Sequence, residues 1–100
     1  MARFDVYVLL QPKSVDYVLN VQSDLLEQLN TRMVVPLLSK NSLKPIRDLN
    51  PVFTIEGKEY MMMTQAMASI SQKELKQKVC SLENKRDEII HALDILLTGF

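Results

Sequence analysis

The chain contains few side chains with the chemistry of catalysis. It has a single cysteine, Cys80, and a single histidine, His91, which excludes metal motifs built on paired histidines. A nucleophilic cysteine needs an electropositive environment and a nearby base, so we interpret Cys80 as a small buried side chain and His91 as a solvent-exposed or interface residue. The sequence lacks a Walker loop, a glycine-rich dinucleotide signature, a serine nucleophile elbow and a cluster of metal ligands. We therefore predict no catalytic residues, no metal site and no cofactor.

An enzymatic alternative would centre on Arg32, which could contact a phosphate as in a ribonuclease, with Thr31 and Asp24 completing the site. The interpretation that we favour is a structural ion pair between Arg32 and Asp24 or another carboxylate. The chain has 12 basic and 12 acidic residues and a net charge of zero. A neutral protein has no general attraction to a phosphate backbone, so nucleic acid is not the expected partner. Weak charge repulsion also favours self-association.

Three apolar features suggest contact surfaces. Leu25 and Leu26 stand in a segment with no strand pattern, and either one of them is buried or both form an apolar surface on a loop. The methionines at 61–63 and Met67 are interpreted as core residues, although successive strand residues point to both faces, so at least one should meet a second layer or a second protomer. The amphipathic pattern of residues 95–100 continues to the last residue, which predicts either docking into the core or a surface for another molecule.

The elements that position these residues are predicted to be strands over the first two-thirds of the chain. Alternating apolar residues predict strands at 3–10 and 16–22. Residues 32–38 are apolar on both faces and predict a central strand, with Pro36 at a bulge or at a strand end. Gly57 is predicted to turn a hairpin whose strands are 51–55 and 60–64, and a short strand follows at 68–70. The connections are predicted at residues 10–14, 39–50 and 72–81.

A helix is predicted to complete the chain, with Ser81 as its N-cap and Gly99 as its C-terminal cap. Ile95 projects from the face opposite its apolar stripe. The stripe expected to pack on the domain comprises Leu82, Ile89, Ile90, Leu93, Leu96, Leu97 and Phe100. With no linker or repeat in the sequence, residues 1–100 are predicted to form one domain. The N-terminal residues lack the long apolar core of a signal peptide, and no apolar run reaches about 18 residues, so we expect a cytoplasmic protein without a membrane span.

Three blocks of sequence carry a resemblance to a known family. They are residues 21–26 (Val-Gln-Ser-Asp-Leu-Leu), 32–37 (Arg-Met-Val-Val-Pro-Leu) and 62–70 (Met-Met-Thr-Gln-Ala-Met-Ala-Ser-Ile), followed by a helix that ends in glycine and an apolar residue. In this order and spacing they resemble the CcdB family, toxins of bacterial toxin–antitoxin modules that poison DNA gyrase. The resemblance covers nearly the whole chain. It implies a mostly β (α+β) fold: an SH3-like barrel with a five-stranded antiparallel sheet, a smaller sheet and a long C-terminal α-helix.

The resemblance also implies partners and their contact residues. Family members are homodimers that bind the A subunit of DNA gyrase without enzymatic activity, and a CcdA-like antitoxin neutralises them through a disordered segment that folds on the toxin. The gyrase-binding residues that carry over are Leu25, Leu26, Asp94, Leu97, Thr98, Gly99 and Phe100. The dimer interface is expected to include Ile95, Leu96 and Met67, which would explain an isoleucine on the second face of the helix.

This chain departs from the best-known family member at the tip of the helix. That member ends in tryptophan-glycine-isoleucine, whereas this chain ends in Thr98, Gly99 and Phe100. Phe100 could supply the aromatic area one position later, and Asp94 replaces an asparagine and adds a charge that needs a donor on the target. Two rivals therefore stay open: an endoribonuclease toxin of the same barrel type, and a homologue that binds an antitoxin but no longer harms gyrase.

Overall fold

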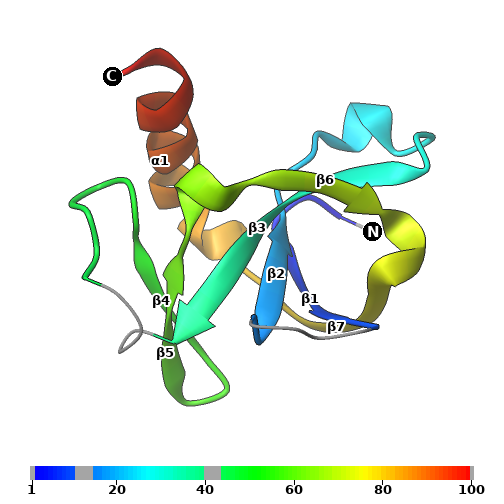
Figure 1. Cartoon of the computed structure of the whole chain (residues 1–100), viewed down its shortest axis with the longest axis horizontal. Helices are drawn as coiled ribbons and strands as arrows, with labels where there is room; N and C mark the ends of the chain where they lie inside the picture. The colour runs from blue at the N-terminus through cyan, green and yellow to red at the C-terminus, as the bar shows by residue number, and fades with distance from the viewer. Residues whose placement is uncertain (1, 11–14, 40–43, 100) are drawn as a thin grey trace.

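The computed structural model describes residues 2–10, 15–39 and 44–99 (Figure 1). Its seven strands form one curled antiparallel sheet in the order β4-β5-β3-β2-β1-β7, with β6 paired to β3 beside β5. The strands are β1 (Asp5–Leu9), β2 (Tyr17–Asn20), β3 (Thr31–Ser39), β4 (Val52–Ile55), β5 (Lys58–Met62), β6 (Ala68–Ser71) and β7 (Leu75–Ser81).

One α-helix, α1 (Arg86–Thr98), follows the last strand and projects from the sheet (Figure 1). The short 3-10 turns are η1 (Asp24–Leu26), η2 (Thr64–Ala66), η3 (Gln72–Glu74) and η4 (Glu83–Lys85). The predicted fold class is confirmed: a mostly β, barrel-like α+β fold with one C-terminal helix. The five strands β6, β3, β2, β1 and β7 make the larger part of the sheet, and β5 and β4 extend it from the end of β3.

The long central strand β3 is shared by both parts of the sheet. On one side it pairs with β2, and on the other it pairs first with β6, up to Val34, and then with β5, from Leu37. Pro36 lies between these two stretches, and its carbonyl accepts a hydrogen bond from the N–H of Met63 at 2.9 Å. Because the N–H and C=O of a strand residue point to the same side, the missing N–H of Pro36 falls where β3 changes partners. The proline is therefore inside the strand, and its prediction at a bulge or strand end is wrong.

The hairpin between β4 and β5 is tighter than predicted. Glu56 and Gly57 have φ values of 51° and 81°, and Ile55 pairs directly with Lys58. Two successive residues with positive φ form the two-residue turn that suits the twist of antiparallel strands. The strand β5 therefore begins at Lys58, two residues before the predicted strand.

The edge strand β7 was predicted to be part of a connection, and that prediction is wrong. It pairs with β1 from Leu75, opposite Leu9, to Ser81, opposite Asp5, with two register shifts on the way. Its middle residues, including Lys76 and Lys78, are exposed. The exposed residues and the register shifts together remove the alternating apolar pattern that predicts a strand. Exposed lysines are typical of edge strands because they oppose pairing with another molecule.

The core has two parts because the sheet buries side chains on both of its faces. Neighbouring residues of β2, Val18 and Leu19, belong to different clusters, and neighbouring strand residues point to opposite faces. The larger cluster lies between the sheet and α1, where Ile89 is fully buried. Met61 and Met62 are also fully buried, which confirms the interpretation of these two methionines as core residues.

The helix begins and packs differently from the prediction. The Ser81 hydroxyl accepts the N–H of Glu83, the first residue of η4, at 3.2 Å, but α1 starts only at Arg86 with Lys85 as its N-cap residue, so the prediction of Ser81 as the N-cap of the helix is wrong. The buried stripe ends at Leu93, because Leu96 is 36% exposed and Leu97 is 68% exposed, although both were expected to pack on the domain. Ile95, predicted to project away from the core, is half-buried. Within the described residues, no helix has the length and apolar character to cross a membrane.

Candidate protein-binding site

The loop between β2 and β3 displays three leucines. The Ser23 hydroxyl accepts the N–H of Leu25 at 3.2 Å and starts η1, a turn without a buried residue. Leu25 is 93% exposed, and Leu26 and Leu29 are each 49% exposed. Of the two interpretations of Leu25 and Leu26, the structure therefore supports an apolar surface on a loop.

Polar side chains beneath the loop hold it in this conformation. Arg32 is 5% exposed, and its Nη1 donates to the carbonyls of Leu29 and Thr31, the latter at 2.8 Å. Its Nη2 donates to the Glu27 carbonyl at 2.8 Å. The Gln22 side-chain amide donates to the carbonyls of Leu26 and Thr31 at 3.1 and 3.2 Å. The loop is thus held through its backbone carbonyls, which leaves its leucine side chains free to face outward.

These contacts change the interpretation of Arg32. Its guanidinium bonds to carbonyls, whereas the Asp24 carboxylate accepts the backbone N–H of Arg3 at 2.9 Å, so the predicted ion pair between Arg32 and Asp24 is wrong. A buried guanidinium with both terminal nitrogens bonded to the protein is poorly placed to receive a phosphate. Thr31 remains exposed beside it. The three residues therefore do not form the open, positively charged site of a ribonuclease.

The C-terminal end of α1 provides the second exposed apolar surface, formed by Leu96 and Leu97. Gly99 has a φ of 82° and its N–H donates to the carbonyls of Asp94 and Ile95 at 3.1 and 3.0 Å, which ends the helix as predicted. The Thr98 hydroxyl donates to the Asp94 carbonyl at 2.6 Å. The Asp94 side chain is exposed, as are Thr98 and Gly99. Phe100, the remaining predicted gyrase contact, lies outside the described residues.

A groove of about 610 Å³ joins the loop to the helix. We call it the apolar groove; its floor is formed by β3 and β6, and its sides by the η1 loop and α1. Its lining residues are Arg3, Val21, Gln22, Ser23, Leu26, Leu29, Thr31, Met33, Met67, Ser69, Leu93 and Leu97.

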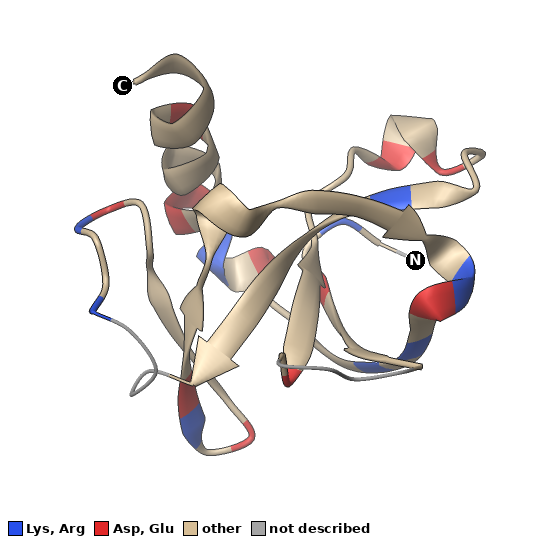
Figure 2. Cartoon of the chain, in the orientation of Figure 1, with Lys and Arg blue, Asp and Glu red and all other residues tan. Residues whose placement is uncertain are grey.

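The apolar groove brings together three predicted site residues that are far apart in sequence: Leu26 from the loop, Met67 before β6 and Leu97 from the helix. β6 has no charged residue, and the C-terminal half of α1 has only Asp94 (Figure 2). Leu25, Asp94, Ile95 and the other predicted contacts in the described chain lie outside this lining. The structure therefore unites only part of the predicted site.

The sequence prediction missed several residues of the apolar groove, above all Arg3, Leu29 and Met33. Leu29 stands in the same leucine-rich segment as Leu25 and Leu26, so the crowding of leucines was a usable signal. Arg3 and Met33 enter the groove because β1 and β3 lie on either side of β2 in the sheet. No local pattern in the sequence predicts that arrangement.

A model of the CcdB protein family matches residues 3–99. The chain belongs to the CcdB family. It is thus a toxin of the kind found in toxin–antitoxin modules. Among solved structures, it resembles one described as an endoribonuclease in complex with its cognate antitoxin from Mycobacterial species. The two share 13% identity and a TM-score of 0.79 over 97% of this chain and 94% of that chain, a likeness that shows a common fold.

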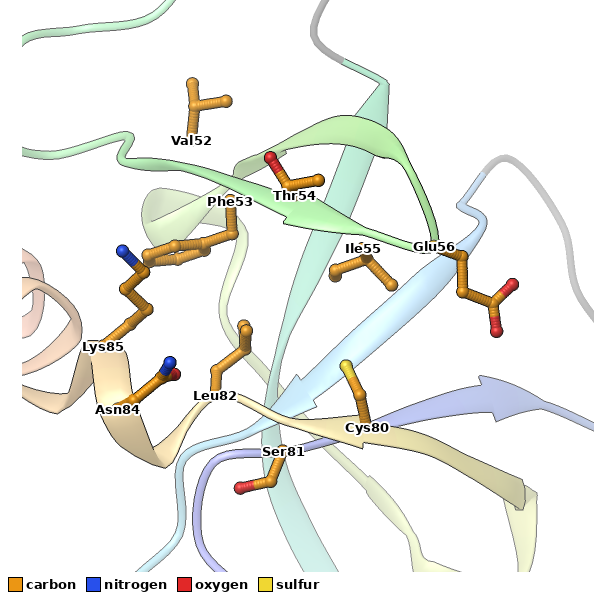
Figure 3. A pocket seen from close by; sticks show the side chains of 10 residues that line it. All are labelled: Val52, Phe53, Thr54, Ile55, Glu56, Cys80, Ser81, Leu82, Asn84 and Lys85. Carbon is orange, nitrogen blue, oxygen red and sulfur yellow. The ribbon is translucent and has the colours of Figure 1, made fainter.

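A second cavity of this CcdB-family chain, about 350 Å³, lies between β4 and the end of β7 (Figure 3). Phe53, Ile55 and Leu82 give it an apolar wall, and the thiol of Cys80 points toward Ile55 (Figure 3). Burial raises the pKa of the Cys80 thiol, and the Glu56 carboxylate raises it further. Because the thiolate is the reactive form, Cys80 is a poor nucleophile, in agreement with the sequence interpretation. The side chain is half-buried, less than that interpretation expected.

His91 lies on the exposed surface of α1. Its Nε2 is 4.0 Å from Oδ2 of Asp48, and both side chains are more than half exposed, which agrees with the prediction of a solvent-exposed or interface residue. Across the part of the chain that the structure describes, no group of three histidine, cysteine, aspartate or glutamate side chains could hold a metal ion.

Proposed function

We propose that this CcdB-family chain binds the A subunit of DNA gyrase and traps the complex of gyrase with cleaved DNA. The observation that carries the proposal is the exposure of leucines around one groove. Leu26, Leu29 and Leu97 line the groove and are 49%, 49% and 68% exposed, and Leu25 on the same loop is 93% exposed. Apolar side chains concentrated on one surface favour burial against another protein.

The mechanism that fits this surface is binding without chemistry. The candidate reactive groups are either unsuited or already bonded: the pKa of Cys80 is raised, and Arg32 is buried beneath the loop. The exposed residues at the helix tip, Asp94, Thr98 and Gly99, would form the polar part of the gyrase contact. A protein that fits between the gyrase subunits while DNA is cleaved needs to stabilise one conformation of gyrase, and binding energy alone supplies that.

We further propose that the toxin acts as a homodimer. In the last turns of α1, Ile95 is half-buried and Leu96 is 36% exposed, and the half-buried Met67 lines the apolar groove. Two helices that met at a two-fold axis would cover these side chains and present two copies of Thr98, Gly99 and Phe100. Such a symmetric surface suits the symmetric dimer of gyrase A subunits.

A CcdA-like antitoxin is the proposed regulator of this cytoplasmic toxin. A disordered antitoxin segment that folds on the toxin can cover a wide apolar surface. If that segment occupied the same leucines, gyrase and antitoxin would exclude each other.

The endoribonuclease alternative is the second candidate function. The shared fold with an endoribonuclease favours it. The burial of Arg32 and its bonds to the Glu27 and Thr31 carbonyls argue against it, because the only arginine assigned to that site has a structural role. Incubation of the purified protein with RNA separates the two functions, because the alternative requires cleavage.

Expression in two hosts tests the proposal: one with sensitive gyrase and one whose gyrase is resistant through its A subunit. We expect growth arrest in the first host alone. Leu25→Asp should relieve the arrest, whereas Leu10→Asp should not, because Leu10 is also exposed, at 55%, but lies outside the predicted gyrase contacts. Equal arrest in both hosts would contradict gyrase as the target, and absence of arrest would favour the inactive homologue that binds antitoxin only.

A further inference from the structure

The curled sheet leaves its two edge strands, β4 and the end of β7, on either side of the cavity of about 350 Å³ in Figure 3. We call it the edge cavity; it is lined by residues 52–56, 80–82, 84 and 85. The sheet order begins at β4 and ends at β7, so among the described strands each of the two pairs on one side alone. The edge cavity is thus a seam at which the barrel-like sheet is open.

The backbone of β4 directs hydrogen-bonding groups away from β5 at two residues. Ile55 flanks the two-residue turn, and residues in that position exchange hydrogen bonds across the hairpin. Bonded and non-bonded pairs alternate along an antiparallel ladder, and the N–H of Met62 donates to the Pro51 carbonyl at 2.9 Å, which fits this alternation. Val52 and Thr54 therefore point their N–H and C=O groups out of the hairpin, along the open edge.

The end of β7 provides backbone groups from the other side of the edge cavity. The N–H of Leu82, the residue after β7, donates to the Phe4 carbonyl at 2.8 Å, so the backbone of Leu82 faces β1. Neighbouring residues alternate in this respect, which turns the N–H and C=O of Ser81 away from β1. An extended chain in the edge cavity would thus meet backbone groups on both of its sides. A folded copy of the protein could not use both, because one side of its β4 is already paired with β5.

The two edge strands differ in how they oppose pairing with another chain. β7 carries the exposed Lys76 and Lys78 and two register shifts, all of which disfavour an added strand. β4 reads Val-Phe-Thr-Ile, without a charge or a proline, and all four residue types are enriched in strands. Because proteins ordinarily protect such an edge, the unprotected β4 indicates a place where a strand is added.

The lining of the edge cavity determines the chemistry of the added strand. Phe53, Ile55 and Leu82 are almost fully buried and form an apolar wall, which suits apolar side chains at alternate positions. The exposed Glu56 and Lys85 lie at opposite ends of the cavity (Figure 3). Glu56 directly follows β4, so a strand antiparallel to β4 begins near Glu56 and ends near Lys85. Charge complementarity then requires a basic residue at the start of the segment and an acidic residue at its end.

We propose that the edge cavity binds an extended segment of a partner protein as an added strand antiparallel to β4, with alternating apolar residues between a basic residue and an acidic one. The segment pairs with the backbone of Val52 and Thr54 and closes the open seam of the sheet. The edge cavity lies outside the residues assigned to gyrase and to self-association, so this inference is independent of the proposed function.

Differential peptide selection provides the first test. A library of random 12-residue peptides is selected on the full-length wild type, on Thr54→Pro and on Thr54→Val. Proline removes an N–H that does not face β5 and so spares the hairpin, whereas valine keeps that N–H. We expect peptides with the basic, apolar and acidic order that bind the wild type and Thr54→Val, and bind Thr54→Pro about tenfold more weakly. Absence of this class of peptides, or a class without the charge order, would overturn the proposal.

Amide hydrogen exchange with one selected peptide bound to the wild type measures the pairing directly. The N–H of Thr54 should exchange about tenfold more slowly in the complex, whereas that of Ile55, which already faces β5, should change little. Unchanged exchange at Thr54 would show that the peptide does not pair with β4 and would overturn the proposal. This measurement uses the wild type alone and does not depend on the folding of any variant.

Charge exchange tests the direction of the added strand. Glu56→Lys should weaken the selected peptide about two- to fivefold, the range for an exposed charge pair. The double variant with Glu56→Lys and Lys85→Glu should prefer the peptide whose two charged residues are interchanged. Lys76→Glu is the matched control, because Lys76 is exposed but does not line the edge cavity, and it should leave the affinity unchanged. A double variant with the original preference would contradict the antiparallel strand.

A second copy of the chain is the competing occupant of the β4 edge. Sedimentation tests it: if the wild type is a dimer and Thr54→Pro alone converts it to a monomer, β4 is an interface between copies and the proposal is overturned. Circular dichroism of Thr54→Pro shows that the variant is folded. The gyrase test is separate, because growth arrest by the wild type occurs or fails independently of peptide binding at this edge.

Discussion

Replacing Arg32 by methionine should destabilise the protein more than any exposed charge could. Hydrogen bonds to a charged group each contribute about 1.5–3 kcal/mol, and the Arg32 guanidinium donates to the carbonyls of Glu27 and Leu29 in the loop and of Thr31 at the start of β3. The full sum overstates the effect, because the substitution also removes the cost of burying the charge and lets water reach some of the carbonyls. We expect a loss of about 3 kcal/mol in the free energy of unfolding, the lower end of the range for a broken buried polar group.

Urea unfolding at one protein concentration measures this loss, and a thermal melt should show a Tm roughly 12–24 °C lower for a domain of this size. Arg86→Met is the matched control: its guanidinium is 3.6 Å from a Glu83 carboxylate, but both side chains are more than half exposed. An exposed pair of this kind contributes about 0–1 kcal/mol. Amide hydrogen exchange should also accelerate in the loop of Arg32→Met. If Arg32→Met lost no more stability than Arg86→Met, the loop would not depend on the buried guanidinium and our interpretation of it would be wrong.

Three further perturbations test other parts of the structure. Ile95→Asp should convert a dimer into a monomer in sedimentation experiments, and a dimer that persists would show that this face of α1 has been assigned wrongly. Gly99→Ala should cost about 1 kcal/mol in unfolding experiments, because a side chain at a φ of 82° is strained although no atom lies within 4 Å of the added Cβ; a stabilised variant would contradict this. Because the raised pKa of Cys80 leaves less thiolate at a given pH, its alkylation should be slower than that of a free cysteine and should accelerate at higher pH; a rate equal to that of glutathione at pH 8 would refute the effect of burial.

The features that the sequence predicted well are those set by local chemistry. Gly57 marked the hairpin, since a turn with positive φ strongly favours glycine, and Gly99 marked the end of α1 for the same reason. The apolar run before and after Pro36 marked a strand covered on both faces. The crowded leucines at 25 and 26 marked a break between strands, because neither helix nor strand periodicity accommodates them.

The features that the sequence could not predict depend on long-range pairing. β7 escaped prediction because its lysines face solvent and its register against β1 shifts twice. The role of Arg32 could not be predicted, because only the shape of the loop brings the Glu27 and Leu29 carbonyls to its guanidinium. The apolar groove combines residues from near both ends of the chain, Arg3 and Leu97, and only the order of the strands brings them together.

The way in which the η1 loop is held has a consequence for how its exposed surface can evolve. Arg32 and Gln22 bind backbone carbonyls, which every residue type provides, and Leu25 leaves 93% of its side chain in solvent. Changes at the outward positions therefore alter the surface that the loop exposes while the framework that shapes it stays intact. Such a separation lets a toxin and its antitoxin drift together, and lets a duplicated copy acquire a new target, without first losing the ability to fold.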